Sequence, residues 1–425
     1  MYFTRVCLIQ QTLVFSALLI QHFAPSPIPP MTIAILHNYY QHRGGEDTVF
    51  EAEARLLEER GHNVIRYAVH NDSVSAYSQV RLARATVWNP DSYNALLALF
   101  RTEKPDVVHC HNTLPLISPS AYAAANDAGI PVVQTLHNYR LLCANALFFR
   151  EGRVCEDCLG KFFAFPALQH RCYRGSLPAS AVVAGMTAWH RLWGTWGKRV
   201  DRYIALTEFA RAKFVEGGLP PEKIVVKPNF VETDAGFAHA EETRNYALYV
   251  GRLSEEKGLM TALKAWRLLA DNGSEQEFHI IGSGPLEAEA KDFVRQHNLD
   301  SVSFLGQKPF SEALEAMKFA RMLIFPSLLY ETFGKSMIEA FSGGTPVIAS
   351  RLGALAEVVR DGYTGFHFEV GDAESLALAL RRMNELSLDR YASMRLAARR
   401  EYEEHYTAEA NMRLLERVYE ECRVR

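Results

Sequence analysis

The sequence contains no hydrophobic run long enough to cross a membrane. The apolar stretch near the N terminus, residues 6–20, is shorter than the about 20 residues that a spanning helix needs, and Gln10, Gln11 and Thr12 interrupt it. A secretory signal is disfavoured because no clean small-x-small cleavage site precedes Pro25. Met31 instead begins directly on an apolar strand pattern. We therefore interpret residues 1–30 as a leader or a misassigned upstream start, with a weak membrane anchor as the alternative, and expect a cytoplasmic protein.

Neither sign of charge dominates the composition. The 425 residues include 46 Lys and Arg and 49 Asp and Glu, which gives a net charge of −3. Proteins that bind nucleic acid usually carry a basic excess, so no nucleic-acid partner is expected. With 48% hydrophobic residues, a chain of this length can bury two sizeable cores. These figures indicate a soluble protein of two domains.

A complete dinucleotide-binding fingerprint is also missing. Gly282 and Gly284 supply two of the glycines of Gly-x-Gly-x-x-Gly, but Glu287 stands where the third is required. That third glycine normally allows the helix to pack closely on the strand. An NAD-dependent oxidoreductase is therefore disfavoured and is kept only as an alternative.

Strands and helices alternate through most of the chain, which indicates α/β domains with parallel sheets. A polar stretch at residues 229–244 has few apolar anchors and is the expected linker. It separates an N-terminal domain, residues 31–230, from a second domain, residues 245–405. The last segment, residues 406–425, is expected to be helical.

The stretch from Ile324 to Ser350 predicts a strand, a turn, a helix and a second strand. The first strand ends at Phe325 and the helix begins after Gly334. Backbone N–H groups at such a helix start, here those of Phe333, Gly334 and Lys335, favour a phosphate. Two carboxylates, Glu331 and Glu339, flank the turn and suit sugar hydroxyls rather than phosphate. The arrangement favours a nucleotide-diphosphate sugar as ligand.

Glu331, seven further residues, Glu339 and the following Gly344-Thr-Pro-Val resemble the donor-site signature of the retaining glycosyltransferases of family 4, also called group 1 glycosyl transferases. The resemblance implies the GT-B fold, with two facing Rossmann-like domains and a C-terminal helix that crosses back onto the first domain. It also implies sugar transfer from a nucleotide-diphosphate sugar to a hydroxyl acceptor, lipid-linked or a polysaccharide intermediate, with retained configuration. A non-catalytic nucleotide-sugar-binding subunit is the alternative.

The resemblance assigns further residues to this site. Arg252 and Lys257 project from the same turn, which follows a strand. They look like the family's pair of cations beside the departing diphosphate. Glu331 would hold sugar hydroxyls, Glu339 the ribose, and His137 the transferred sugar. Gly44 and Gly45, after the first strand, allow the backbone to approach the donor, and the loop of Gly282 and Gly284 lies beside the nucleotide in the family. No Asp-x-Asp occurs, which argues against a metal-dependent GT-A enzyme, and no cofactor is expected for catalysis.

A segment of the first domain, about residues 138–180, interrupts the regular pattern with four of the seven cysteines: Cys143, Cys155, Cys158 and Cys172. A Cys-x-x-Cys pair with two further thiols matches the tetrahedral sulfur set that zinc prefers, and disulfides are rare in the cytosol. No second Cys-x-x-Cys pair is present, so buried or incidental thiols are the alternative to structural zinc.

Trp189, Trp193 and Trp196 recur at helical spacing with basic residues nearby. Such a stripe suits an interfacial helix at the inner face of a membrane, although tryptophans at this spacing are also typical of a protein core. The sequence thus leaves peripheral membrane contact open.

Overall fold

The computed structural model describes residues 29–41 and 43–423. Thr32–Arg425 forms one compact unit. Most of the expected leader or upstream start at residues 1–30 lies outside the described residues. In the part of the chain that is described, no helix is both long and apolar enough to cross a membrane.

The first domain is built on a six-stranded sheet in the order β2-β1-β3-β4-β7-β8, and every pair of neighbours is parallel. Its inner strands are buried on both faces, as expected for apolar strands between two layers of helices. The strands are β1 Thr32–Tyr39, β2 Asn63–His70, β3 Val107–Asn112, β4 Val132–Thr135, β7 Arg202–Ala205 and β8 Ile224–Val226. The helices are α2 Gly45–Glu59, α3 Gln79–Val87, α4 Pro90–Glu103, α5 Ser120–Asp127, α7 Leu177–Leu192, α8 Thr195–Lys198 and α9 Glu208–Glu216.

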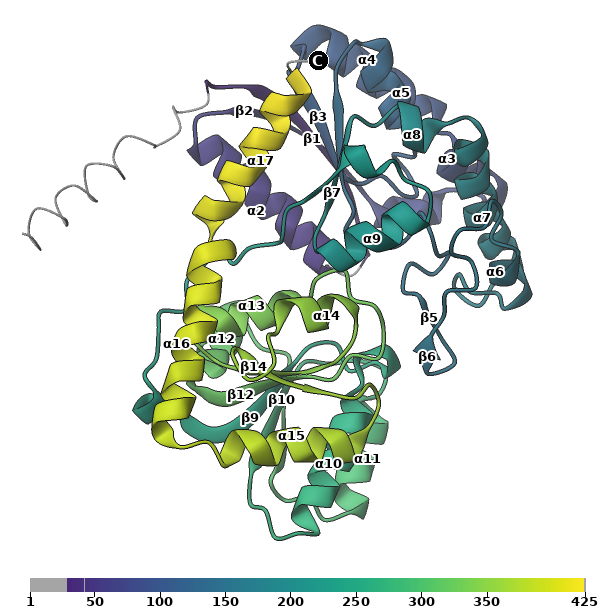
Figure 1. Ribbon diagram of the computed structural model, residues 1–425. Coiled ribbons are helices and arrows are strands. Elements are labelled where there is room, and N and C mark those ends of the chain that lie inside the picture. Colours follow the sequence, from purple (N-terminus) through teal and green to yellow (C-terminus); the bar gives the residue numbers. More distant parts are fainter. Residues whose placement is uncertain (1–28, 42, 424–425) are drawn as a thin grey trace, which may run out of the picture. The chain divides into compact units, whose positions relative to one another are not determined.

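The second domain repeats this plan in the order β11-β10-β9-β12-β13-β14, again with parallel neighbours (Figure 1). Its strands are β9 Arg244–Val250, β10 Glu277–Ile281, β11 Val302–Gly306, β12 Ala320–Phe325, β13 Val347–Ser350 and β14 Gly365–Phe368. Its helices are α10 Leu259–Ala270, α11 Glu287–Gln296, α12 Phe310–Phe319, α13 Lys335–Ser342, α14 Gly353–Val358, α15 Ala373–Asn384 and α16 Leu388–His405. The predicted α/β class with two parallel-sheet, Rossmann-like domains is confirmed.

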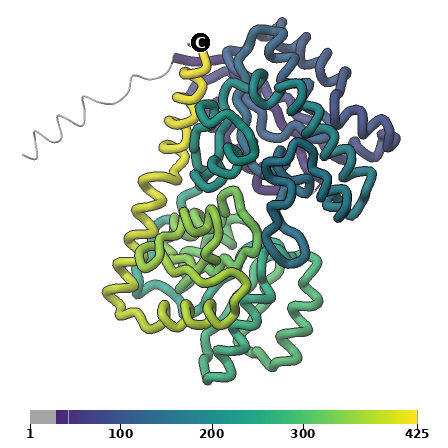
Figure 2. The backbone as a smooth tube through the Cα atoms, turned by 45° about the vertical axis from the view of Figure 1, so that its right-hand side comes forward, coloured from purple at the N-terminus to yellow at the C-terminus, as the bar shows by residue number. Residues whose placement is uncertain are grey.

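The chain passes between the domains twice, and the two passages run side by side. Val231 pairs with Thr407 in an isolated parallel bridge, and the Val231 N–H donates to the Tyr406 carbonyl at 2.9 Å. The last helix, α17 Ala408–Arg423, then contacts α2 and β3 of the first domain (Figures 1 and 2). The C-terminal helix therefore crosses back as the resemblance implied.

The cysteine-containing segment forms a short antiparallel hairpin, β5 Phe149–Arg150 and β6 Arg153–Val154, followed by the five-residue helix α6 Phe165–Gln169. α6 packs on α7, so the segment is attached to the first domain. Extended loops in this segment, rather than regular elements, bring the cysteines together.

The expected tryptophan stripe is wrong in one respect. α7 ends at Leu192, and Gly194, with φ of 67°, breaks the helix before α8 begins. Trp196 is consequently a core residue whose indole N–H donates to the Thr187 carbonyl, whereas Trp189 and Trp193 are exposed and pack against each other. Only two of the three tryptophans remain candidates for a membrane contact.

Candidate active site

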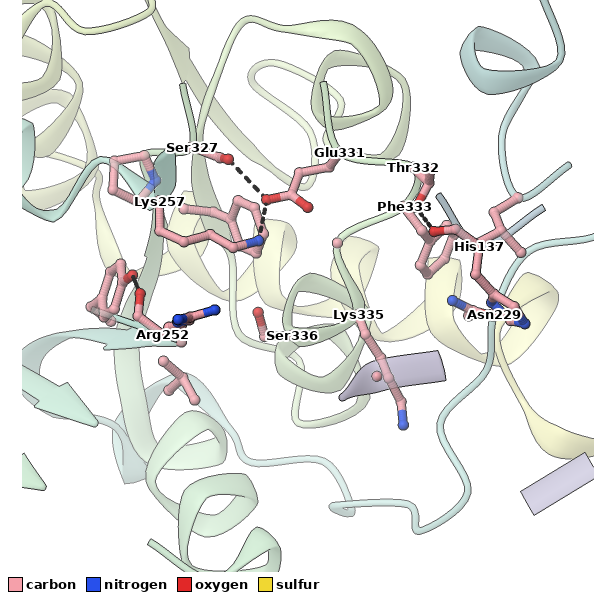
Figure 3. A pocket seen from close by; sticks show the side chains of 18 of the residues that line it. His137, Asn229, Arg252, Lys257, Ser327, Glu331, Thr332, Phe333, Lys335 and Ser336 are labelled. Carbon is pink, nitrogen blue, oxygen red and sulfur yellow. Dashed lines mark hydrogen bonds and ion pairs between the residues drawn. The ribbon is translucent and has the colours of Figure 1, made fainter. Parts of the chain in front are cut away.

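Loops at the carboxyl ends of the parallel strands line a cavity of about 520 Å³ (Figure 3). The turn after β9 contributes Arg252 and Lys257. The loop after β12 contributes Pro326, Ser327 and the four residues 331–334. From the first domain come Gly45 and His137. Ligands in open α/β sheets bind at this edge. Eight predicted site residues are thus brought together: Gly45, His137, Arg252, Lys257, Glu331, Phe333, Gly334 and Lys335.

Glu331 is held by two neighbours. The Lys257 ammonium donates to Glu331 Oε1 at 2.6 Å, and the Ser327 hydroxyl donates to the same oxygen at 2.8 Å (Figure 3). The Glu331 side chain is 13% exposed and that of Lys257 is 29% exposed. The pair is therefore partly buried, with the second carboxylate oxygen and two ammonium hydrogens left for a ligand.

Positive charge and free amides face the same cavity without protein partners. Within residues 29–41 and 43–423, the Arg252 guanidinium makes no hydrogen bond or ion pair, and the amides of Phe333, Gly334 and Lys335 find no acceptor. α13 begins at Lys335, so these amides stand at the positive end of its dipole. Together they form a site for an anion of more than one negative charge.

Two glycines shape this anion site. Gly334 has φ of 93° at the start of α13, a conformation that disfavours a side chain, and a Cβ there would lie 2.6 Å from Met337 Cε. Gly258, with φ of 71°, lies so close to the Pro326 carbonyl that a Cβ would be 1.9 Å from its oxygen. The turn after β9 and the loop after β12 are thereby held against each other.

Four other predicted residues do not line this cavity. Gly44 caps α2 and its N–H donates to Asp47 Oδ2 at 2.8 Å. Gly282 and Gly284 have a packing reason for lacking side chains, since a Cβ on either would collide with the backbone of Gly251 or Leu253. Glu339 lies in α13 and is 8% exposed, and burial raises the pKa of its carboxyl although Lys335 opposes the shift. Donor contacts from these four remain predictions.

His137 lines both the first cavity, described above, and a second one of about 730 Å³ in the first domain. It is the one residue that lines both among the residues described. His111, Asn112, Asn138 and Arg140, polar residues at the ends of β3 and β4, line the second cavity as well. His109 does not, because it is fully buried between Tyr419 and Thr135.

His137 contacts a buried polar cluster that consists of His111, Glu53, Lys227 and Asn411. The His137 and His111 rings meet at 2.9 Å, from Nε2 to Nδ1, and His111 Nε2 lies 3.4 Å from Glu53 Oε2. Lys227 donates to Glu53 Oε1 at 2.8 Å and to Asn411 of α17 at 2.9 Å. Burial alone would raise the pKa of Glu53, but Lys227 and His111 hold it well below its usual range. The carboxylate is therefore ionised inside the protein.

The negative charge of Glu53 determines how the two imidazoles share their hydrogens. A carboxylate only accepts, so it favours a hydrogen on His111 Nε2, which leaves His111 Nδ1 bare in the neutral ring. His137 then donates from Nε2 and keeps Nδ1 as an acceptor. Burial lowers the pKa of His137 well below its ordinary value, so the ring is neutral at pH 7. The cluster thus presents a neutral His137 and favours the tautomer with hydrogen on Nε2.

Glu53, His109 and His111 place ligand atoms within 4.8 Å of one another, a spacing that a metal ion could use. The surroundings do not fit one. Both ring nitrogens of His109 are taken by the hydroxyls of Tyr419 and Thr135, at 2.7 and 2.8 Å. The Lys227 ammonium already supplies the positive charge beside Glu53. We interpret this group as a buried ion pair with its hydrogen bonds, not as a metal site.

Sequence analysis missed Glu53, Lys227 and Glu46. The signal for Glu53 was its position in α2, where Phe50, Ala54 and Leu57 give the spacing of a buried helix face on which a carboxylate is anomalous. Glu46 lines the first cavity and accepts hydrogen bonds from Asn138 and from Tyr40, at 2.6 and 3.0 Å. No pattern in the sequence pointed to Glu46, because its partners come from distant loops.

The buried histidines predict a dependence of stability on pH. Burial is the main cause that lowers the pKa values of His109, His111 and His137 from 6.5, so below about pH 6.5 the unfolded chain binds protons that the folded chain does not. Stability is therefore full above pH 6.5 and falls as the pH drops. We expect the free energy of unfolding in urea to fall by more than about 1.4 kcal/mol per pH unit between pH 6 and 5. A free energy that does not change over this interval would contradict the buried neutral state.

Comparison with known proteins identifies the family to which the chain belongs. The family model for glycosyl transferases group 1 matches residues 232–401, and the model for glycosyltransferase family 4 matches residues 43–235. Taken together the two matches extend over both domains. The chain belongs to the family 4 glycosyltransferases.

Curated relatives are similar over about half of the chain. Amylovoran biosynthesis glycosyltransferase AmsK of Erwinia amylovora is 30% identical over 226 residues, 51% of this chain and 55% of that protein. Phosphatidyl-myo-inositol mannosyltransferase of Mycobacterium leprae is 30% identical over 237 residues, 52% of this chain and 61% of that protein. The chain thus spans little more than half the length of the curated relatives it matches.

Solved structures are similar over nearly the whole chain. A glycosyltransferase from Rickettsia africae aligns with a TM-score of 0.66 at 17% identity, covering 92% of this chain and 98% of that one. HepE from Anabaena, solved in complex with UDP, gives a TM-score of 0.65 at 16% identity, covering 92% and 100%. At this level of identity the likeness concerns the fold, which is GT-B.

Proposed function

We propose that this protein transfers a sugar from a nucleotide-diphosphate donor to a hydroxyl acceptor, with retention of configuration. One observation carries the proposal. An unpaired guanidinium, a lysine, three free amides at a helix start and a carboxylate all face one cavity at the carboxyl ends of the strands. Cations and amides suit a diphosphate, and the carboxylate suits the hydroxyls of a sugar.

In the proposed reaction the acceptor oxygen bonds to the anomeric carbon while the bond from that carbon to the diphosphate oxygen breaks. The acceptor's proton leaves with the nucleoside diphosphate. Arg252, Lys257 and the amides at Gly334 stabilise the charge that develops on the departing diphosphate. Glu331 holds a sugar hydroxyl through its second oxygen, and His137 contacts the sugar at the passage to the second cavity.

The donor is tested by ligand-induced stabilisation of the purified protein. UDP or GDP should raise the melting temperature, because the cavity offers a site for a diphosphate. NADH should not raise it, because the chain lacks the third glycine of the dinucleotide-binding fingerprint. Stabilisation by NADH alone would instead favour an oxidoreductase.

Glu339 is proposed to accept hydrogen bonds from the ribose. Exchange of its carboxylate for an amide, in Glu339→Gln, should weaken binding of the nucleotide by about 1–3 kcal/mol, with a smaller effect on turnover at saturating donor. Calorimetric titration of the nucleotide measures this change. Glu315→Gln, at an exposed carboxylate of α12 in the same domain, is the matched control and should bind normally. Normal binding by Glu339→Gln would remove the residue from the site.

The acceptor is proposed to be lipid-linked and to enter the second cavity. Val80, Leu82 and Ala83 of α3 and Val182 and Val183 of α7 form apolar walls there. Two guanidinium groups line the same cavity, those of Arg140 and Arg174, and neither forms an ion pair with a carboxylate among the described residues. Apolar walls with cations suit a hydrocarbon chain that carries a phosphate.

This acceptor assignment is tested with small amphiphiles as competitors of transfer. Dodecyl phosphate should inhibit transfer. Butyl phosphate lacks the long hydrocarbon chain and dodecyltrimethylammonium lacks the anion, so neither of these two compounds should inhibit transfer. Arg174→Gln should weaken inhibition by dodecyl phosphate several-fold. Arg171→Gln is the control, because Arg171 is also exposed and has a similar positive φ but does not line the cavity. Equal inhibition by all three compounds would exclude a lipid-phosphate site.

We further propose that the reaction takes place in the cytoplasm at the inner face of a membrane. In support, exposed apolar side chains occur on the elements around the second cavity, including Val80, Leu177, Trp189 and Trp193. Indole rings at a surface suit the headgroup region of a bilayer. No cofactor takes part in the proposed transfer, and any zinc at the cysteines would be structural.

A further inference from the structure

Four cysteines that are far apart in the sequence line one small cavity. Cys143 follows the loop after β4, Cys155 and Cys158 follow the β5–β6 hairpin, and Cys172 follows α6. The cavity measures about 10 Å³, room for a single atom-sized occupant. None of the four is in a disulfide, and no histidine or carboxylate shares the lining. The donor set is therefore sulfur only.

From this arrangement we propose that Cys143, Cys155, Cys158 and Cys172 bind one zinc ion as four thiolates. Zinc takes sulfur ligands tetrahedrally at about 2.3 Å, so the sulfur atoms of a closed site lie about 3.8 Å apart. No three of these sulfurs lie within 4.8 Å of one another within the described residues. Closure on the ion therefore draws the loops inward.

The surroundings offer a cation to sulfur that carries negative charge. Arg150 lines the cavity; its Nη2 pairs with Asp157 at 3.0 Å, and among the described residues its buried Nε and Nη1 have no hydrogen-bond partner. A cation with unsatisfied N–H groups beside the ligands helps to offset the double negative charge of a zinc ion with four thiolates.

Zinc at this position would fix a segment that reaches both cavities. Phe148 contacts Tyr330, the residue before Glu331, with ring centroids 6.1 Å apart. At the other end, Tyr173 and Arg174 line the second cavity directly after Cys172. Because four thiolates leave no open position, the ion would hold these residues in place and take no part in transfer.

The first test is the metal content of the unaltered protein, purified under reducing conditions without added metal. About one zinc per chain is expected. A mercurial reagent that titrates thiols should release the zinc in proportion to the amount added. Cobalt should replace the zinc and give the absorption spectrum of a tetrahedral thiolate site. Far less than one zinc per chain, or disulfides among the four cysteines in the native protein, would overturn the proposal.

Variants then locate the ion. Cys158→Ser should lose the zinc, whereas Cys422→Ala, at a cysteine of α17 outside the cavity, should keep it. We expect Cys158→Ser to bind nucleotide normally and to lose most transfer to acceptor, since the donor site lies mainly on the second domain. Full zinc in Cys158→Ser would show that the ion is bound elsewhere. If this variant does not fold, the metal content and cobalt spectrum of the unaltered chain decide.

Discussion

Arg252→Ala and Lys257→Ala should each lower turnover by on the order of 10² or more while the fold survives. Both cations face the position expected for the departing diphosphate, and their interaction strengthens as its charge develops. Among the described residues the Arg252 guanidinium has no hydrogen-bond or ion-pair partner, so its charge is available to the ligand. Lys257 must in addition divide its hydrogens between Glu331 and the donor.

The difference between the two variants is informative. Lys257→Ala leaves Glu331 with the Ser327 hydroxyl alone, so it should also disturb sugar binding, whereas Arg252→Ala should act mainly on turnover. Lys264→Ala, at an exposed lysine of α10 beyond the site loop, is the control and should be fully active. Steady-state rates at saturating donor, with circular dichroism to check folding, measure these effects. Unchanged turnover in both site variants would exclude this site from the reaction.

Glu53→Gln should destabilise the protein by about 3–5 kcal/mol. The substitution leaves the Lys227 ammonium buried, at 1% side-chain exposure, without its carboxylate partner. It also removes the charge that orients His111 and through it His137. The free energy of urea unfolding should therefore fall, and transfer should fall with it even where the variant remains folded.

Two further variants separate charge burial from simple damage to α2. Glu58→Gln removes a carboxylate from the same helix, but its ion pair with Arg66 is exposed and should contribute no more than about 1 kcal/mol. Glu53→Gln combined with Lys227→Met should recover part of the lost stability, because no unpaired charge is then buried. A double variant less stable than Glu53→Gln alone would contradict the ion-pair interpretation.

The alternation of strands and helices was sufficient to predict both parallel sheets, since buried strands and amphipathic helices leave periodic patterns. The start of α13 at Lys335 and the turn that carries Arg252 and Lys257 were also predictable, because glycines and charges at loop ends follow from local geometry. The Trp196 prediction failed because a single αL residue, Gly194, ends the helical periodicity between two tryptophans.

The buried cluster could not be predicted for a different reason. Glu53, His111 and Lys227 come from α2, β3 and the end of β8, and only the order of strands in the sheet and the return of α17 bring them together. Contacts of this kind depend on tertiary packing and leave no spacing rule in a single sequence. The second cavity could not be predicted for the same reason, because its apolar walls depend on the packing of α3 against α7.

The most direct test of the central claim is a mass-spectrometric assay of purified protein with a panel of nucleotide sugars and a lipid-phosphate acceptor. We predict that one nucleotide sugar is consumed, that its nucleoside diphosphate is released with the sugar on the acceptor, and that Arg252→Ala abolishes most of this release. Nucleotide binding without consumption of any donor would contradict the assignment of an enzyme and leave a nucleotide-sugar-binding subunit.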